Sequence, residues 1–410
     1  MGSETFTAAG APWVPQEWLF SVLVAFTTDH HLFLLFAILV SAMPPLALWL
    51  VFMRSRDDAL PATGIALAFC GFALAASFGV RAQVLGWAFF AALLLLLERR
   101  DRWYWAAIPL TIAWANIHAS AAVVPVIVLA RLVAVASEGG LRAVRASRDL
   151  LLLPAVLLAL VCTPLGLRLP IYALTLAHSP IRHYILEWQP SGLGDFAFMY
   201  GAVPLAIGIL FGGRAALLGR RLQSFPAALL FAAALFAGRN VPLFAIAAAP
   251  LFAFALTSRL PLLSRLNERM KELEPVALVA VVAMIGASAW LQHQRQQQDP
   301  PRLPLAAIAS VASDGADHRV LCENFTWCSV ALGYPRLRVF IDGRCDPYPL
   351  NVWQQYMATI SGKSPNAALR RYDVDRVIAT RGSTVAKQLT ADSAWRVAFT
   401  DRNYVVFRRE

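Results

Sequence analysis

Apolar stretches alternate with short polar junctions over the first 292 residues of the chain. Reading by hydropathy, we count ten such stretches: 32–53, 59–80, 82–97, 103–117, 119–136, 150–165, 196–213, 225–238, 241–258 and 275–292. A membrane-crossing helix needs roughly 17–25 mainly apolar residues, and most of the stretches reach or approach that length. The pattern predicts a polytopic α-helical membrane protein with about ten transmembrane helices, which form a bundle over residues 31–292.

The chain before the first span is predicted to be an exported segment, residues 1–30, that carries an interfacial helix. Residues 14–28 have an apolar body too short to cross a bilayer. Trp13 and Trp18 are side chains that suit the headgroup level. Residues 1–16 contain neither the basic region nor the apolar region of a cleavable signal peptide.

The pattern changes after a polar linker at residues 293–304. Runs rich in β-branched and aromatic residues predict strands at 319–323, 337–342, 375–380, 395–400 and 404–409. Helices are predicted between them at 326–334, 351–361, 365–372 and 384–391. Strands that alternate with helices predict a soluble α/β domain over residues 305–410, which ends in an antiparallel hairpin.

Composition and charge place the chain in a membrane. With 58% hydrophobic residues, 15% charged residues and a mean hydropathy of +0.57, it is too apolar for a soluble protein. One set of alternate junctions holds 15 Lys and Arg residues and the other set only four arginines. This asymmetry predicts that the basic side is cytoplasmic and that the C-terminal domain is exported. The same anchoring accounts for the net charge of +11, so a nucleic-acid partner is not expected.

Unusual polar residues of the membrane part gather in hairpins that are predicted to face outward. These residues are Arg81, Asn116, His118, Glu187, Trp188, Arg239 and Asn240. Two arginines suit a phosphate or pyrophosphate, and a glutamate and a histidine near them suit proton transfer to or from a hydroxyl. Such a set fits a sugar that leaves a lipid phosphate at the outer leaflet. The alternative is that Arg81 and Arg239 only snorkel to the interface.

The outer loop and the exported domain offer further candidates. Residues 171–188 have helical spacing, which would place His183 and Glu187 on one face of a helix. The two could form an ion pair, a metal half-site, an acid–base pair or a plain polar contact. Asp342 and Arg344 follow a predicted strand and could bind an acceptor, although Asp-Gly is also a common turn.

The cysteines predict one disulfide in the exported region. Cys322, Cys328 and Cys345 lie there, and an odd number suggests one pair and one thiol. Cys328–Cys345 is the expected pair, although the sequence does not fix it. Cys70 and Cys162 lie in apolar stretches and are expected to be packing residues.

Signatures of soluble enzymes are absent from the sequence. The chain has no Walker loop, no GxGxxG motif after a strand, no HExxH and no GxSxG. No metal site or cofactor is predicted, and the sequence leaves open whether a divalent cation takes part.

A series of short motifs resembles one family through its order and spacing. The motifs are PWVPQEW (12–18), FGVRAQ (78–83), WANIHAS (114–120), CTPLGLRLPIYA (162–173), ILEWQP (185–190), GRNVPLFAIAAAP (238–250), ENFTW (323–327) and VFIDGRCDPY (339–348). They are similar to bacterial multi-spanning proteins described as glycosyltransferase-like, within the GT-C superfamily of polyprenyl-phosphate-sugar-dependent transferases. The resemblance covers nearly the whole chain and implies a membrane bundle with an exported α/β domain.

The sequence departs from that family at its beginning. Relatives usually start with another helix and an acidic, Trp-rich loop that supplies the catalytic carboxylate, and this chain starts just beyond that loop. We interpret this as a late start codon, a truncation or loss of catalysis. With that loop missing, Glu17 or Glu187 is the available base and His118 orients the substrate or relays a proton. Phosphate is expected at Arg81 and Arg239. The remaining substrate-binding candidates are Asn116, His183, Trp188, Asn240, Asp342 and Arg344.

Three functions compete at this point. The first is a glycosyltransferase of the bacterial inner membrane, in contact with membrane lipids, that moves a sugar from a polyprenyl-phosphate donor to a periplasmic glycan or lipid acceptor. The second is a non-catalytic membrane scaffold in envelope polysaccharide assembly, which the missing acidic loop favours. The third is a transporter or flippase, which the lack of an inverted repeat and of mid-membrane charges other than Arg131 argues against.

Overall fold

A computed structural model describes residues 5–11, 13–75, 79–99, 101–263 and 303–410. The chain divides into two compact units, which are described here one by one. The helical unit consists of Val14–Ala177 and Ile185–Gln297. The α/β unit consists of Met1–Trp13, His178–Tyr184 and Gln298–Glu410. The first 13 residues and a short piece of the long loop therefore belong with the C-terminal domain.

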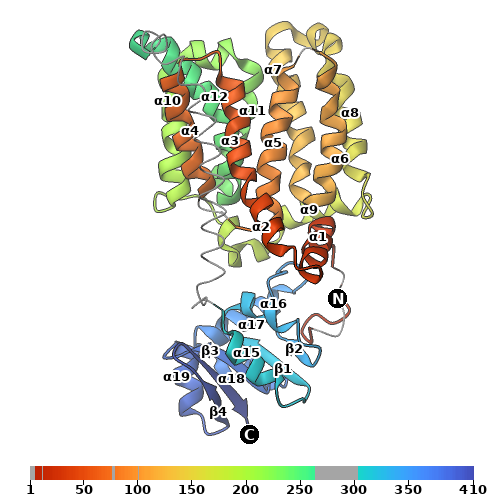
Figure 1. Cartoon of the computed structure of the whole chain (residues 1–410), viewed down its shortest axis with the longest axis vertical. Coiled ribbons are helices and arrows are strands. Elements are labelled where there is room, and N and C mark those ends of the chain that lie inside the picture. Colours follow the sequence, from red (N-terminus) through yellow and green to blue (C-terminus); the bar gives the residue numbers. More distant parts are fainter. Residues whose placement is uncertain (1–4, 12, 76–78, 100, 264–302) are drawn as a thin grey trace. The chain divides into compact units, whose positions relative to one another are not determined.

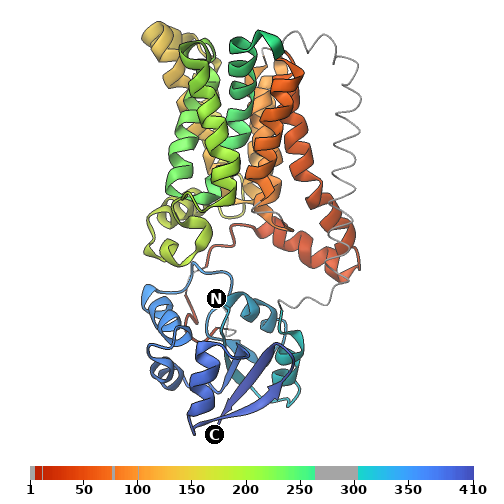
Figure 2. The ribbon, with the colours of Figure 1, turned by 90° about the vertical axis from the view of Figure 1, so that its left-hand side faces the viewer.

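Helices build the helical unit, and most of the longer ones run side by side (Figures 1 and 2). They are α1 (Trp18–Asp29), α2 (Phe33–Ser41), α3 (Met43–Ser55), α4 (Leu60–Ala75), α5 (Ala82–Glu98), α6 (Ala107–Ile117), α7 (Val123–Ala146), α8 (Arg148–Val161), α9 (Arg168–His178), α10 (Val203–Gly219), α11 (Arg221–Phe236) and α12 (Val241–Arg259). Helix α1 confirms a helix in the predicted range 14–28, although it begins only at Trp18.

Four helical segments within the described residues are long and apolar enough to cross a membrane. They are Phe33–Ser55, Ala119–Ala146, Phe198–Gly219 and Gly238–Arg259. These segments agree with a multi-pass membrane protein, and the count of ten helices stays a prediction. The predicted span 275–292 and most of the predicted linker 293–304 lie outside the described residues.

The bounds of several predicted spans differ by a few residues from the helices in the structure, and two spans differ most. The span predicted at 32–53 is divided at Ala42 into α2 and α3, because Pro44 and Pro45 occupy the first turn of α3, where proline's missing N–H costs nothing. The span predicted to end at residue 136 continues as α7 to Ala146. Its backbone leaves helical geometry at Gly139 and Gly140.

Helix α12 forms the centre of the helical unit. Every residue from Val241 to Ala253 is buried, and the helix packs against α10, α4, α11 and α3. Small residues allow this close packing. A Cβ atom added to Gly208 of α10 would lie 2.1 Å from the ring of Phe252, so glycine is required at that crossing.

The α/β unit contains one five-stranded sheet with helices packed against it (Figure 1). Its strands are β1 (His318–Cys322), β2 (Leu337–Val339), β3 (Arg376–Thr380), β4 (Trp395–Thr400) and β5 (Tyr404–Arg409). Its helices are α15 (Leu305–Ala312), α16 (Phe325–Ala331), α17 (Leu350–Ile360), α18 (Pro365–Arg371) and α19 (Thr384–Ala391). All five predicted strands and all four predicted helices are confirmed, and α15 is an additional helix.

The sheet order is β2-β1-β3-β5-β4. Strands β2, β1 and β3 are parallel, and β5 and β4 form the predicted antiparallel hairpin beside β3. Val320 and Cys322 of β1 face a core shared with α15 and α16. Leu321, which alternation directs to the opposite face, is also fully buried. Burial on both faces is typical of parallel strands.

The N-terminal segment adds to the edge of this sheet. Thr5 is fully buried and forms a parallel bridge with Val339 of β2. The hydroxyl of Thr7 donates to the carbonyl oxygen of Phe340, and the ring of Phe6 packs against that of Phe340. These contacts hold the start of the chain against the α/β unit.

The predicted disulfide is wrong. The bond joins Cys322, at the end of β1, to Cys328 in α16, and Cys345 lies outside it. The segment between β1 and α16 turns back on itself, which brings Cys328 close to Cys322 within the core of the α/β unit. Cys70 is buried as expected, whereas Cys162 is exposed at the end of α8.

Candidate active site

One candidate pair joins the start of α1 to the turn after α6. Glu17 is the N-cap residue of α1, and His118 is the C-cap residue of α6. Glu17 Oε1 lies 3.2 Å from Nε2 of His118. The His118 side chain is 3% exposed and the Glu17 side chain is 38% exposed. A buried imidazole therefore contacts a carboxylate that the surroundings can reach.

Hydrogen bonds fix the tautomer of His118. Its Nδ1 accepts the backbone N–H of Ser120 at 2.9 Å, so Nδ1 carries no proton. The proton of the neutral ring is then on Nε2, which donates to Glu17. Burial lowers the pKa of His118 by more than the neighbouring carboxylate raises it. The imidazole is therefore a neutral hydrogen-bond donor that holds Glu17 in place.

The environment of Glu17 favours its ionised form. Burial alone would raise the pKa of the Glu17 carboxyl, but the hydrogen bond from His118 opposes this effect. The positive charges of Arg239 and Arg81 act in the same direction as His118, and the pKa lies below its usual range. Both arginines also act on His118. The four residues therefore share one electrostatic environment.

A second candidate pair is formed by Arg81 and Glu187. Arg81 is the N-cap residue of α5, and Glu187 lies in the 3₁₀ turn Leu186–Trp188. The two side chains form an ion pair in which Arg81 is 50% exposed and Glu187 31% exposed. An exposed ion pair contributes little to stability. This pair is thus available for exchange with a ligand.

Arg239 lies next to this pair on a different helix. It belongs to the 3₁₀ turn Gly238–Asn240 before α12, and its guanidinium stacks 4.1 Å from the ring centre of Trp188. The ring fixes the plane of the guanidinium and leaves the donors at its edge available. Glu187 interacts electrostatically with Arg239. Arginines from two helices therefore converge on one carboxylate.

A cavity of about 490 Å³ adjoins the cluster. Its polar lining residues are Glu187, Gln189, Asp195 and Arg239. Asp195 accepts the N–H of Ala197 at 3.1 Å, and the carbonyl of Gln189 accepts the N–H of Gly238 at 3.0 Å. A cavity of this size with a guanidinium and carboxylates in its wall has room for a phosphate and a sugar ring.

Two of the predicted binding residues, Asn116 and Asn240, make hydrogen bonds that tie structural elements together. The amide group of Asn116 donates to the carbonyl oxygens of Ile112 and Cys162, at 2.8 and 3.0 Å, and accepts from Trp18. Asn116 therefore ties α1, α6 and α8 together. Asn240 donates to the carbonyl of Ala233 at 3.0 Å and secures the turn before α12.

The predicted pairing of His183 with Glu187 on one helix is wrong. Helix α9 ends at His178, and the following residues form two separate 3₁₀ turns, Pro180–Tyr184 and Leu186–Trp188. Three residues per turn replace the spacing that would align positions four apart. The two residues also belong to different units.

Asp342 and Arg344 form a closed turn in the α/β unit. Asp342 is fully buried and accepts Arg344 Nη2 at 2.6 Å and the Tyr348 hydroxyl at 2.5 Å. This contact with Asp342 raises the pKa of Arg344. The arginine also lies 5.5 Å from the ring centre of Trp13. The geometry favours the turn interpretation over an acceptor site.

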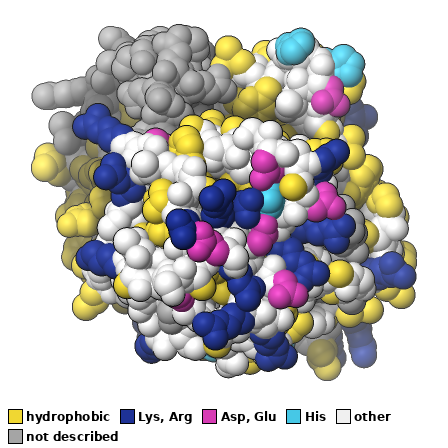
Figure 3. Space-filling view, turned by 90° about the horizontal axis from the view of Figure 1, so that it is seen from below, with side chains coloured by type: hydrophobic (Ala, Val, Ile, Leu, Met, Phe, Trp, Pro, Cys, Tyr) yellow, Lys and Arg dark blue, Asp and Glu magenta, His cyan; other side chains and the backbone are white. Residues whose placement is uncertain are grey.

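Basic and acidic side chains are intermingled on the face that Figure 3 shows.

Three residues of the site were not predicted. Ser120 fixes the tautomer of His118, and Gln189 and Asp195 line the cavity. Gln189 directly follows Glu187-Trp188 in the sequence, which is a usable signal. Nothing in the sequence marks Asp195, because its position depends on how the loop folds back to α12. Among the residues that the structure describes, no group of three or more His, Cys, Asp or Glu side chains is arranged to hold a metal ion.

Comparison with known proteins relates the fold to two membrane enzymes. No protein-family model and no curated protein matches the chain. The apo structure of ArnT from Cupriavidus metallidurans is similar with a TM-score of 0.51 and 14% identity, over 90% of this chain and 83% of that one. The apo oligosaccharyltransferase of Archaeoglobus fulgidus is similar with a TM-score of 0.50 and 12% identity, over 92% of this chain and 63% of the archaeal chain. Both are GT-C glycosyltransferases, so the chain has a GT-C-like fold, as its motifs indicate.

Proposed function

We propose that the chain is a multi-pass membrane glycosyltransferase that moves a sugar from a polyprenyl-phosphate donor to a glycan or lipid acceptor. The observation that carries the proposal is the convergence of Glu17, His118, Arg81, Glu187 and Arg239 at one end of the helical unit, beside a cavity. The GT-C-like fold supports the same class of reaction.

Arg81 and Arg239 are suited to hold the donor phosphate. Both are at helix starts, and Trp188 orients Arg239. When the sugar leaves, negative charge grows on the bridging phosphate oxygen, and guanidinium donors stabilise that charge. Because Arg81 is paired with Glu187, an arriving phosphate competes with the carboxylate for the same guanidinium.

A carboxylate supplies the base in this proposal. The bond between the anomeric carbon and the phosphate oxygen breaks, a bond from that carbon to the acceptor oxygen forms, and the hydroxyl proton passes to the carboxylate. Glu187 is released when phosphate takes Arg81, which makes it the favoured base. Glu17 stays ionised beside neutral His118, and the positive charges of Arg81 and Arg239 act on it as well. Its role is to orient the acceptor or to take the proton in its place.

We place this end of the helical unit at the outer face of the bacterial inner membrane and the α/β unit in the periplasm. We also propose about ten membrane crossings. The unequal distribution of basic junctions supports the orientation, and the four long apolar helices support repeated crossing.

Reconstitution with a labelled donor tests the proposal. Purified full-length protein in liposomes is given a radiolabelled polyprenyl-phosphate sugar and membranes of the source organism as acceptor. Arg81→Ala and Arg239→Ala are each expected to lower transfer by about 10²–10³-fold. Arg56→Ala, whose side chain is 64% exposed and lies in the junction between α3 and α4, is the control. Unchanged transfer in both test variants would rule out their phosphate role.

A scaffold without catalysis is the second candidate. It is favoured by one observation, which is that Glu17 and Glu187 both already have partners in the structure. Normal assembly of the envelope polysaccharide in cells that carry Glu17→Gln and Glu187→Gln together, but not in cells that lack the protein, would support it.

A further inference from the structure

A chain of hydrogen bonds lies behind the contact between Glu17 and His118 in the helical unit. The indole nitrogen of Trp114 donates to the hydroxyl oxygen of Ser120 at 3.0 Å, and that oxygen lies 2.7 Å from Nδ1 of His118. On the other side of the ring, Nε2 of His118 lies 3.2 Å from Glu17 Oε1. Trp114 is fully buried and His118 is 2% exposed. The inner part of the chain is therefore shielded from water.

The indole fixes the direction of this chain. An indole N–H can only donate, so the Ser120 oxygen accepts there and its own proton is free to point at His118. The backbone N–H of Ser120 points at the same ring nitrogen, at 2.9 Å. A proton on Nδ1 would meet that N–H, so Nδ1 accepts and the ring proton lies on Nε2. Each donor in the chain therefore points toward the carboxylate of Glu17.

Gly86 of α5 leaves the space that this arrangement needs. A Cβ atom there would lie 3.1 Å from the hydroxyl oxygen of Ser120 and 3.2 Å from the indole nitrogen of Trp114. Any side chain at this position would thus press on the hydrogen bond between the two residues. Arg81 caps the start of the same helix. The helix that presents the proposed phosphate-binding arginine therefore also supports the chain behind Glu17.

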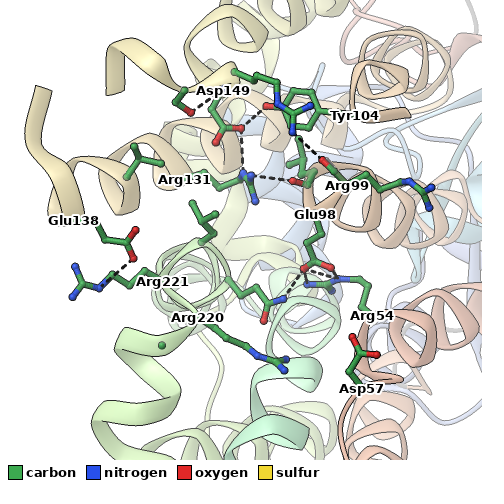
Figure 4. Close-up of a pocket in the computed structure, with 17 residues that line it drawn as sticks. Arg54, Asp57, Glu98, Arg99, Tyr104, Arg131, Glu138, Asp149, Arg220 and Arg221 are labelled. Atoms are coloured by element: carbon green, nitrogen blue, oxygen red, sulfur yellow. Dashed lines mark hydrogen bonds and ion pairs between the residues drawn. The ribbon is translucent and has the colours of Figure 1, made fainter. Parts of the chain in front are cut away.

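Carboxylates at the other end of α5 have charged partners. A second cavity, of about 630 Å³, is lined there by Glu98, the last residue of α5. Figure 4 shows arginines and carboxylates in contact around it. Glu98 binds Arg54 at 2.9 Å, and Asp149 binds Arg131 at 3.2 Å. Glu17 contacts a neutral ring instead, so no opposite charge cancels its own at contact distance.

The surroundings of Glu17 leave its carboxylate open to a ligand. The Glu17 side chain is 38% exposed. Glu17 is the N-cap residue of α1, but its side chain makes no capping hydrogen bond. A negative charge is favoured at the start of a helix. An accessible, ionised carboxylate accepts hydrogen bonds strongly, and hydroxyl groups are the donors that a glycan offers.

We propose that Trp114 and Ser120 are positioning residues that keep Glu17 ionised, so that Glu17 binds a non-reacting hydroxyl group of the acceptor and does not act as the base. The inference rests on the function proposed above and leaves the reacting hydroxyl's proton to Glu187. His118 is a fixed donor in this scheme and not a proton relay, because both donors of Ser120 already occupy Nδ1. The acceptor then carries at least two hydroxyl groups, which favours a glycan as its class.

Nuclear magnetic resonance of the histidine ring nitrogens tests the hydrogen-bond chain without reference to transfer. The full-length protein is labelled at its seven histidines, and the signals of His118 are those lost in His118→Gln. At about pH 7 we expect its proton on Nε2. The Nδ1 signal should shift in Ser120→Ala and in Trp114→Phe, because the hydrogen bond that Nδ1 accepts is lost or weakened. A proton on Nδ1 in the natural protein would overturn the proposal.

Matched controls separate this effect from a general disturbance of the fold. Ser258→Ala removes a hydroxyl that donates to the carbonyl of Phe254 in its own helix, and Trp105→Phe removes a partly exposed indole. Both should leave the His118 signals unchanged. If Trp114→Phe does not fold, Ser120→Ala carries the test. An unchanged Nδ1 signal in Ser120→Ala would remove the basis for its positioning role.

Transfer kinetics test the role of Glu17, with membranes of the source organism as the acceptor probe. In Glu17→Gln the amount of acceptor that gives half-maximal transfer should rise about tenfold, through loss of a charged hydrogen bond. The maximal rate should stay within about threefold, since the base remains. A fall of the maximal rate by about 10²-fold or more, with unchanged half-saturation, would make Glu17 the base and contradict the proposal.

The pH profile distinguishes positioning from a purely structural role of Ser120. In Ser120→Ala the ring of His118 takes up a proton more readily, and a charged ring competes with the acceptor for Glu17. The acceptor requirement should therefore rise in acid, between about pH 7.5 and pH 5.5, more steeply than in the natural protein. An equal rise at every pH would indicate a structural role only. Absence of transfer in the natural protein would contradict the proposed function, whereas the nitrogen signals would still decide the chain behind Glu17.

Discussion

Arg81 holds Glu187 in an ion pair that joins the start of α5 to a loop turn more than a hundred residues later in the chain. Each of the two side chains is therefore engaged by the other, and the ion pair has to separate before either one binds a ligand. The guanidinium that would bind phosphate is engaged by the carboxylate that would act as base. In the proposed reaction, binding of a donor phosphate and release of Glu187 become one event, so that the acceptor would be deprotonated only once the donor is present.

Glu187→Gln is expected to separate donor binding from transfer. Without the competing carboxylate, Arg81 binds phosphate at least as well, so KM for the donor stays the same or falls. The rate of transfer falls by about 10²–10⁴-fold because the base is lost. Steady-state kinetics with a labelled polyprenyl-phosphate sugar gives both values. A raised KM with an unchanged kcat would assign Glu187 to binding instead.

Acid is expected to destabilise the helical unit through His118. Its folded-state pKa lies below the usual histidine value of 6.5. The unfolded chain then takes up the proton first as the pH falls, so stability is present above about pH 6.5 and declines below it. The lowered pKa of the Glu17 carboxyl acts in the same direction below pH 4.5, the usual pKa of a glutamate. Thermal unfolding between about pH 7.5 and pH 5.5 measures the first decline.

His118→Gln is the matched variant for this effect. Its amide can donate to Glu17 and accept from the N–H of Ser120, so the geometry is retained without a titrating ring. The variant should lose the decline between about pH 7.5 and pH 5.5. The same decline in His118→Gln would place its origin at another group.

The crossing of α10 and α12 is expected to tolerate only glycine at position 208. A methyl group there would lie 2.1 Å from the Phe252 ring. Gly208→Ala should therefore destabilise the protein by about 1–3 kcal/mol. Gly64→Ala in α4 meets no atom within 4 Å and should stabilise the helix by about 0.5–1 kcal/mol. Thermal unfolding in detergent compares the two, and equal stability would contradict the close packing at Phe252.

The pattern of hydrophobic residues predicted an element correctly where the length of an apolar run and its polar boundaries determine that element. The strand at 375–380 contains a short apolar run, Val377 to Ala379, that is bounded by polar residues, and β3 forms there with that run buried. The helix at 305–312 was not predicted because its run of small apolar residues is short and follows a polar linker with prolines. Pro44-Pro45 indicates the division between α2 and α3 at Ala42, but hydropathy alone predicts one continuous apolar span there.

The candidate site shows where sequence reasoning ended. The predicted membrane topology placed Glu17, His118 and Arg81 on one face of the membrane. Successive membrane-spanning helices alternate in direction, so each hairpin between them is assigned to one side. Which side chains pair depends on packing, which periodicity does not encode. The contact between His118 and Glu17 depends on how α1 lies against α6, and the hydrogen bond from Asn116 to the carbonyl of Cys162 depends on how α6 lies against the end of α8. The disulfide was mispredicted for the same reason.

The disulfide is expected to stabilise the α/β unit. Cys322 and Cys328 close a short loop, so replacing both by serine should cost about 2 kcal/mol. For a domain of this size the melting temperature falls by about 5–15 °C. A reducing agent should produce the same fall in the natural protein and no further fall in the double variant. An effect of reductant on the double variant would indicate that another cysteine pair forms.

The orientation of the chain is expected to be visible by labelling single cysteines. Lys387 is exposed in α19 of the α/β unit, and Arg56 is exposed in a junction predicted to be cytoplasmic. In intact cells with a permeable outer membrane, a maleimide that cannot cross the inner membrane should label Lys387→Cys and not Arg56→Cys. In disrupted membranes both should react. The natural cysteines are replaced beforehand, because Cys162 is exposed. Labelling of Arg56→Cys alone in intact cells would place the α/β unit and the cluster around Arg81 in the cytoplasm, where a donor at the outer leaflet cannot reach them.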